Sequence, residues 1–284
     1  MNVQPEQSVV LPQGTIFYQE SGSGPPIVFV HGLLVNSNVW CYIMPELSQQ
    51  FRCIAPDLPM GAHTQAVAPD ADLSPPGMAK LVADFIEALD LHDVTLVGND
   101  TGGAISQLVI TNHPEHIERL VLFNADAFEN FLPPVFRMFQ WLPRIPGGTT
   151  IAAQLFRPRI VQRITMKMLS KAGTTSDMLD MFFGRFVREP RIRRDAGKVL
   201  ATISNRYTLE AANKFSAFNK PVLIAWGSDD FIFPKRYATR LTQAFPNAEL
   251  KLIPNARTFV QFDQPALLTA LIRDFIHQWS YRTS

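Results

Sequence analysis

The chain has 284 residues, of which 46% are hydrophobic and 18% charged, with 26 Lys and Arg against 25 Asp and Glu. This composition excludes an intrinsically disordered chain, which would have few apolar residues and a large net charge. The net charge of +1 produces no overall field that would attract nucleic acid. The two cysteines, Cys41 and Cys53, are too few for a disulfide framework, and their spacing does not indicate a metal site.

The first ten residues, MNVQPEQSVV, lack the basic and apolar regions of a signal peptide. No stretch of about 18 uncharged apolar residues predicts a membrane span. We therefore expect a cytoplasmic protein. No internal repeat and no low-complexity tract is visible, so solenoids and propellers are excluded.

Six short runs of mostly apolar residues predict β-strands whose two faces are covered by helices. They lie at 27–30, 52–55, 94–97, 119–123, 222–226 and 250–253. Apolar residues at helical spacing predict amphipathic helices over 76–89 and 267–279. This alternation predicts right-handed crossovers in a doubly wound α/β sheet.

The segment 128–215 has no apolar strand run and is interrupted by prolines, so it predicts several short helices inserted between two strands. We expect a core domain formed by 1–127 and 216–284, with 128–215 as a helical cap domain. The segment carries 15 Lys and Arg against 6 Asp and Glu, a local charge of +9, and the remainder carries −8. Attraction between these layers is a hypothesis for what holds a mobile lid over the core.

The sequence VTLVGNDTGG at 94–103 places Asp100 between a predicted strand and an apolar-periodic helix. Gly98 and Gly102 stand two residues to either side of Asp100. A small residue at both positions around a central nucleophile is typical of a nucleophile elbow, where the helix packs close behind a strained turn. The alternative interpretation is an aspartate that caps the helix. The strand–turn–helix context favours the elbow.

A second strand ends in Val30-His31-Gly32-Leu33. With this motif, the sequence resembles α/β-hydrolase-fold proteins, and in particular the branch with an aspartate nucleophile, which includes haloalkane dehalogenases, fluoroacetate dehalogenase and epoxide hydrolases. The resemblance spans about residues 14–276. It implies a mostly parallel eight-stranded sheet flanked by helices, with a helical cap inserted after the sixth strand.

The same resemblance implies roles for individual residues. The backbone N–H groups of Leu33 and Thr101 would form the oxyanion hole. His31 would pack beneath its loop rather than act as a base, and Trp40 is a candidate for substrate contact.

The triad acid has two candidate positions. IAWGSDD at 224–230 is similar to the WGxxD motif of the family, which makes Asp230 the acid and leaves Asp229 as a turn or capping residue. Asp126, just past the strand before the cap, is the alternative acid.

The base position departs from the family pattern. Members read approximately Gly-His-Phe, an acidic residue and Pro at this point, whereas this chain reads NARTFVQFDQP at 255–265. Phe259 and the Asp-Gln-Pro sequence ending at Pro265 fix the register, so Thr258 stands where the histidine would be. The other histidines are expected at surface or capping positions, with His63 as the remaining candidate for a base.

Three functional hypotheses follow. In the first, Asp100 is the nucleophile of a hydrolase with an incomplete triad, since a carboxylate needs no base in order to attack. In the second, Asp100 is the general base of an isomerase or lyase, and the Leu33 and Thr101 amides hold an enolate-like oxygen. In the third, the protein is a catalytically silent ligand-binding or interaction protein.

The expected partner is a small, largely apolar molecule, because the predicted cap is rich in Phe, Met and Leu. Thr101 and Leu33 replace the residues that hold the halide in haloalkane dehalogenases, and Tyr207 is the single tyrosine in the cap, so neither halide release nor epoxide opening is favoured.

The basic run at 188–194 is either a solvated helix face or an attractor for an anion or a membrane surface. We infer no cofactor and no metal.

Overall fold

The computed structural model describes residues 6–280, and its centre is an eight-stranded sheet in the order β1-β2-β4-β3-β5-β6-β7-β8. The strands β1, β2 and β4 pair antiparallel, and the remaining pairs are parallel. The expected mostly parallel eight-stranded sheet is confirmed, and all six predicted runs are strands. Residues 1–5, on which the expected localisation partly depends, lie outside the described residues. The strands are β1 (Glu6–Leu11), β2 (Gly14–Ser21), β3 (Pro26–Val30), β4 (Arg52–Pro56), β5 (Val94–Asp100), β6 (Ile117–Ala125), β7 (Val222–Gly227) and β8 (Ala248–Ile253).

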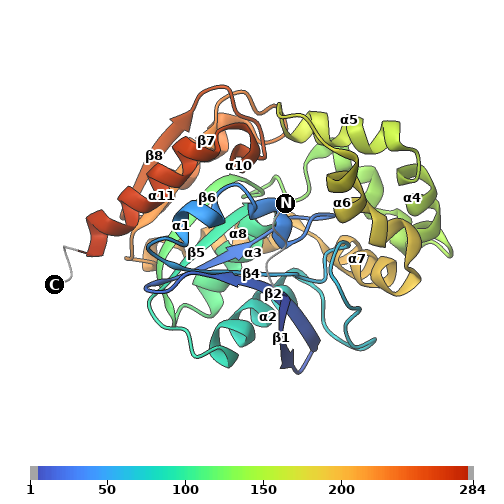
Figure 1. Ribbon diagram of the computed structural model, residues 1–284, viewed down its shortest axis with the longest axis horizontal. Coiled ribbons are helices and arrows are strands. Elements are labelled where there is room, and N and C mark those ends of the chain that lie inside the picture. The colour runs from blue at the N-terminus through green and yellow to red at the C-terminus, as the bar shows by residue number, and fades with distance from the viewer. Residues whose placement is uncertain (1–5, 281–284) are drawn as a thin grey trace.

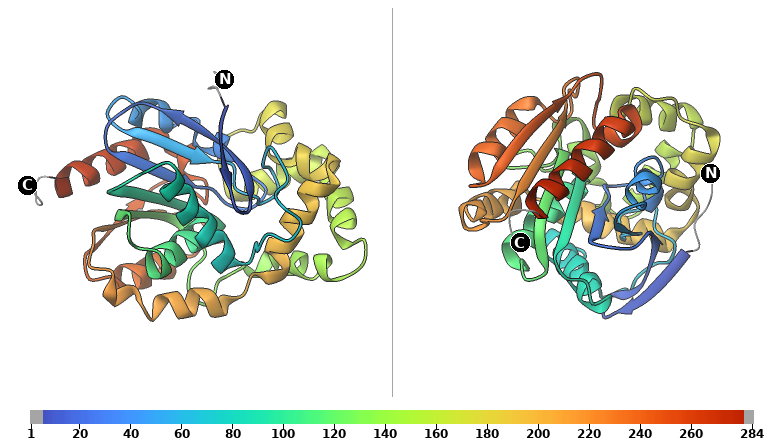
Figure 2. Two further views of the ribbon diagram at one scale, coloured as in Figure 1. Left: turned by 90° about the horizontal axis from the view of Figure 1, so that it is seen from below. Right: turned by 60° about the vertical axis from the view of Figure 1, so that its left-hand side comes forward.

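Helices cover both faces of the sheet, as the continuous apolar strands require. Figure 2 shows α11 on one face and α2 and α3 on the other. The two predicted amphipathic helices are α2 and α11, and the apolar stripe of α2 is buried except at Leu89, which lies half-buried just past the helix. The helices of this domain are η1 (Ser37–Trp40), α1 (Met44–Leu47), α2 (Pro75–Ala88), α3 (Thr101–Asn112), α9 (Lys235–Ala244), α10 (Val260–Asp263) and α11 (Pro265–Ser280).

The helical insertion follows β6, and its helices α4 to α7 form one end of the molecule, at the right of Figure 1. The last α-helix of the insertion, α8, packs against α3 of the core domain. The cap over the sheet's edge therefore consists of the elements before α8. The inserted elements are η2 (Pro134–Gln140), η3 (Leu142–Arg144), α4 (Gly148–Phe156), α5 (Arg159–Leu169), α6 (Ser176–Arg188), α7 (Pro190–Thr202), α8 (Asn205–Ala212) and η4 (Phe215–Ala217).

The carboxyl end of the parallel strands carries the chemistry-bearing residues. Asp100 is the last residue of β5, and Asp126 and Asp230 follow β6 and β7 directly or within a short turn. Open α/β sheets place their ligands at this edge. No helix among residues 6–280 has the length and apolar character that crossing a membrane requires.

Candidate active site

Asp100 occupies a strained turn between β5 and α3. Its φ of 56° and ψ of −133° are rarely adopted by a residue with a side chain, and the β5–β6 register shifts between Asn99 and Asp100. A Cβ atom on Gly102 would lie 2.1 Å from the Val30 carbonyl oxygen, so only glycine allows the helix to pack this closely. The strained turn and the close approach of the helix are the backbone features that the sequence predicts for this segment, and the role of Asp100 as a nucleophile stays a prediction.

The carboxyl group of Asp100 is enclosed on one side and open to a pocket on the other. The backbone N–H groups of Thr101 and Leu33 donate hydrogen bonds to it. A Cβ atom on Gly32 would lie 2.1 Å from Oδ2 of Asp100, so a larger residue at 32 would displace the carboxyl group. Burial raises the pKa of Asp100 to about 7, helped by the nearby Asp230 charge and opposed by the two N–H donors.

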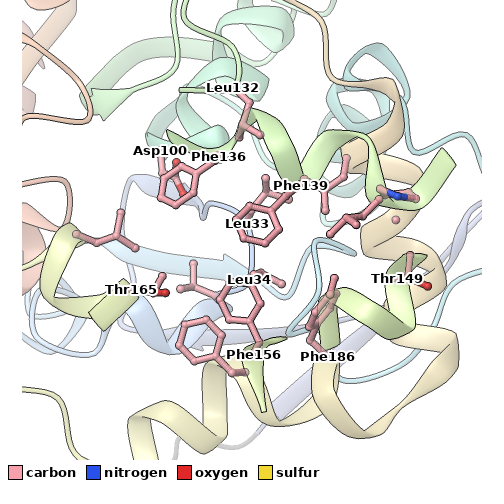
Figure 3. Close-up of a pocket in the computed structure, with 18 of the residues that line it drawn as sticks. Leu33, Leu34, Asp100, Leu132, Phe136, Phe139, Thr149, Phe156, Thr165 and Phe186 are labelled. Atoms are coloured by element: carbon pink, nitrogen blue, oxygen red, sulfur yellow. The ribbon is translucent and has the colours of Figure 1, made fainter. Parts of the chain in front are cut away.

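The pocket beneath the cap is almost entirely apolar. Asp100 is its one ionisable lining residue within 6–280, surrounded by Leu, Phe and Met side chains from η2, η3, α4, α5, α6 and α7. Figure 3 shows the rings of Phe136, Phe139 and Phe156 around the space beside Asp100, with Thr149 at the far end of the pocket. The cavity is small, with a volume of about 90 Å³. It therefore suits a small apolar ligand.

Asp230 lies close to Asp100 but is already fully hydrogen-bonded. One carboxyl oxygen accepts the backbone N–H groups of Ile232 and Phe233 at 2.7 and 3.1 Å. The other accepts Asn124 Nδ2 at 2.7 Å and Thr258 Oγ1 at 2.9 Å. Burial raises the pKa of Asp230, although all four donors lower it.

Thr258 takes the orientation toward Asp230 that a triad histidine would take. Its side chain is completely buried and does not line the pocket. Because its one hydroxyl proton is donated to Asp230, only the oxygen lone pairs remain to accept a hydrogen bond. Its backbone oxygen accepts Asn99 Nδ2 at 2.9 Å, which fixes the loop beside the elbow. A hydroxyl in this setting cannot accept a proton from water as an imidazole can.

Asp126 is a buried carboxyl group beside the elbow. Thr101 Oγ1 donates to its Oδ2 at 3.2 Å, and its Oδ1 has no hydrogen-bond partner among the described residues. Burial, and then the Asp100 charge, raise the pKa of Asp126 well above its usual range. Of the two candidate acids, Asp230 is the one hydrogen-bonded to Thr258.

Trp40, the candidate for substrate contact, packs in the core and does not reach the pocket. Its ring is completely buried, packs on Phe29 with ring centres 5.2 Å apart and meets Phe123 edge-on at 5.9 Å, and is not a lining residue of the pocket. The cap contributes the aromatic lining instead, through residues such as Phe136 and Phe156.

Two histidines illustrate what neighbouring sequence cannot show. His31 has its Nε2 bonded by the Leu58 N–H at 2.9 Å, in keeping with a packing role. The expected surface position of His63 is wrong: the residue is buried, and its Nε2 lies 3.2 Å from Asp195 Oδ2 on α7. The partner is 132 residues away in the chain, so no local pattern indicates the contact. His63 holds the cap to the core.

Other polar residues of the site were not singled out from the sequence. Asn124 donates to Asp230, and its side-chain oxygen accepts the Gly227 N–H at 2.6 Å. Asn99 is held by Gln261, whose Nε2 donates to it at 3.1 Å. The position of Asn99 directly before the elbow residue is the one available signal. Among residues 6–280, no group of three His, Cys, Asp or Glu could hold a metal ion.

The chain is similar in sequence to several known proteins over most of its length. A haloalkane dehalogenase 2 of Mycobacterium tuberculosis is 29% identical over 92% of this chain and 91% of its own. A 2-hydroxy-6-oxo-2,4-heptadienoate hydrolase of Pseudomonas putida is 27% identical over 90% of each chain. An uncharacterized protein of M. tuberculosis is 29% identical over 91% of this chain and 77% of its own.

Solved structures and a family model agree on the fold. An α/β hydrolase fold protein from Burkholderia ambifaria superposes with a TM-score of 0.80 over 94% of this chain and 97% of its own, at 23% identity. A serine hydrolase involved in carbazole degradation gives 0.79 over 97% and 100%, at 20% identity. The family model described as the alpha/beta hydrolase fold matches residues 25–265. The chain therefore belongs to the α/β hydrolase fold family.

Proposed function

We propose that this protein is a hydrolase in which Asp100 attacks a small apolar alkyl compound bound beneath the cap. The observation that carries the proposal is the setting of Asp100. It is the single ionisable group among residues 6–280 that lines the apolar pocket, it lies on a strained turn, and its carboxyl group accepts two backbone N–H groups. A haloalkane dehalogenase and a 2-hydroxy-6-oxo-2,4-heptadienoate hydrolase among the relatives support hydrolytic chemistry.

The first half of the reaction needs no base. One carboxyl oxygen of ionised Asp100 attacks the substrate carbon, the bond from that carbon to the leaving group breaks, and the leaving group departs with the electron pair. The product is an ester between Asp100 and the alkyl group. The N–H groups of Leu33 and Thr101 continue to donate to the carboxyl group of Asp100.

The second half is hydrolysis of this ester. Water adds to the carboxyl carbon of Asp100, and the N–H groups of Leu33 and Thr101 are placed to stabilise the negative charge that develops on the carboxyl oxygen. Collapse of the intermediate releases the alcohol and restores the carboxyl group. Removing the proton from that water is the step for which Thr258 supplies no base, so we expect the ester to accumulate.

The pocket also limits the leaving group. Thr165 Oγ1 already donates to the Val161 carbonyl oxygen at 3.0 Å, Thr149 lies far from Asp100, and Tyr207 does not line the pocket. A leaving group that requires protonation, as in an epoxide, is therefore disfavoured. The pocket instead permits small alkyl compounds whose leaving group departs as an anion without a proton. Alkyl bromides serve as reactive probes of this kind, although Thr101 and Leu33 leave the released halide without the partners that haloalkane dehalogenases provide.

A second candidate function is proton abstraction by Asp100 in an isomerase or lyase. A pKa of about 7 favours it, because a general base works best near the ambient pH. Against it, the N–H groups of Leu33 and Thr101 are occupied by Asp100 itself, so they are not free to hold an enolate oxygen.

Intact-protein mass spectrometry after incubation with short alkyl bromides tests the proposal. We expect one alkyl group per chain, located at Asp100 by peptide mapping, and complete loss of this adduct in Asp100→Asn. The matched control is Asp229→Asn, an exposed carboxyl paired with Lys171, which should label like the wild type. Exchange of substrate hydrogen for deuterium without any adduct would favour the lyase or isomerase, and binding without either reaction would favour a silent binding protein.

A further inference from the structure

The outer face of the cap exposes an unusual number of apolar side chains. Eight of the fourteen large hydrophobic residues that are exposed within 6–280 belong to η2, η3, α4 and α5 or the loops between them. These elements pack on one another in succession at the cap end of the molecule (Figure 1). The eight residues, here called the cap face, are Val135, Met138, Trp141, Ile145, Ile151, Leu155, Ile160 and Ile164.

The same part of the chain is basic throughout. Residues 130–176 contain seven Lys and Arg and no Asp or Glu. Among residues 6–280, no carboxylate lies within ion-pair distance of Arg157, Arg163 or Lys167, all of which are exposed. The basic run at 188–194 differs, since Arg193 donates to the Val187 carbonyl oxygen and Arg194 pairs with Asp195. Unpaired positive charge of the cap therefore lies among its exposed apolar residues, with Arg191 as a further exposed cation outside them.

Each helix of the cap face is divided between two environments. On α4, Ile151 and Leu155 are exposed while Ala152 and Phe156 line the pocket. On α5, Ile160 and Ile164 are exposed while Met166 lines the pocket. An amphipathic helix of this kind, apolar and basic on its outer side, is typical of segments that lie on a membrane surface.

Trp141 is a further residue of the cap face that suits a membrane surface. It is 65% exposed, and the Arg144 guanidinium lies 5.0 Å from its ring centre. Tryptophan with a neighbouring cation suits the level of lipid headgroups, because the ring is amphipathic and the guanidinium binds phosphate.

We propose that the cap face docks this protein on an anionic phospholipid bilayer, so that apolar substrate reaches the pocket from the lipid. A second copy of the chain is a poorer occupant, because a two-fold interface would place the basic segment against itself. A lipid surface of negative charge matches both the cations and the apolar residues. Docking itself is independent of the proposed chemistry at Asp100; the supply of substrate depends on it.

Co-sedimentation with vesicles tests the docking. The wild type should bind vesicles of equimolar phosphatidylcholine and phosphatidylglycerol, and bind pure phosphatidylcholine vesicles far less. The double variant Arg157→Glu/Arg163→Glu should reduce partitioning by about tenfold or more, because each cation contributes near an anionic surface. Trp141→Ser/Ile164→Ser should reduce it comparably by removing apolar contact. Salt raised from about 0.05 to 0.5 M should weaken binding by the wild type.

Matched controls lie on the core domain, where Lys235→Glu and Leu252→Ser change an exposed cation and an exposed apolar residue away from the cap. They should bind like the wild type, as should Asp100→Asn, which separates docking from catalysis. Equal binding to both vesicle types, no binding to either, or unchanged binding by the charge variant would overturn the proposal. So would a dimer, detected by analytical ultracentrifugation, that requires Trp141 and Ile164 and forms without any vesicle binding.

Discussion

The Asp100 end and the Thr258 end of the candidate site differ in what they offer a ligand. Asp100 is open to the pocket, and its carboxyl group accepts the backbone N–H groups of Thr101 and Leu33. Thr258 and Asp230 face each other in a closed set of hydrogen bonds and do not line the pocket. The difference teaches that the two parts of the site are separable: Asp100 is accessible to a ligand, whereas Thr258 and Asp230 satisfy each other's side chains away from the pocket.

The largest effect should come from restoring the missing base. Thr258→His places an imidazole between Asp230 and the pocket, so it should shorten the lifetime of the Asp100 ester about 10²–10⁴-fold. The measurement is decay of the alkylated protein by mass spectrometry, together with release of the alcohol. Thr258→Val, which removes the hydroxyl without adding a base, should leave the lifetime unchanged. An ester that hydrolyses rapidly in the wild type would show that another group activates water.

A smaller effect should follow from pH at the Asp100 end. Only ionised Asp100 can attack, and its pKa is about 7. The rate of adduct formation should therefore fall about tenfold for each pH unit below 7 and level off above it. The readout is labelling rate between pH 5 and 9. A rate that is flat down to pH 5 would contradict a raised pKa.

The same titration has a consequence for folding. A carboxyl whose pKa is raised in the folded state contributes stability that is full below its unfolded pKa of 3.8 and is lost as pH rises through about 7. Asp100→Asn removes this loss, so its gain in melting temperature over the wild type should be larger at pH 8 than at pH 4. An equal difference at both values would contradict the burial of an ionisable group at this position.

The smallest expected effects concern two contacts between the cap and the core, one buried and one exposed. Asp195 is completely buried and accepts His63 Nε2 and the Val67 N–H, whereas Lys171 and Asp229 form an exposed pair. Asp195→Asn should cost about 1–3 kcal/mol of stability, because buried donors lose an acceptor. Lys171→Ala should cost less than about 1 kcal/mol. Urea denaturation compares the two, and a similar cost would indicate that long-range charge attraction holds the cap.

Much of the fold was predictable because local patterns determine it. Strands that are buried on both faces give continuous apolar runs, and helices that are buried on one face give apolar residues at helical spacing. These two patterns predicted β3 to β8, α2 and α11 correctly. The flanking glycines and the strand–turn–helix order predicted the sharp turn at Asp100, which lies between β5 and α3. The spacing to Phe259 placed Thr258 at the position of the family histidine, and its role stays a prediction.

Tertiary structure alone decided which of these residues face a ligand. Asp230 and Thr258 are 28 residues apart, and the hydrogen bond that Thr258 donates to Asp230 forms only through folding. Neither residue lines the pocket. His63 meets Asp195 across the cap, and Trp40 is enclosed between rings of β3 and β6, which no local spacing reveals. The sequence by itself determined which functional groups are present and near which strand ends they lie. Their availability depends on side chains from distant segments, because burial and hydrogen-bond satisfaction are properties of the packed chain.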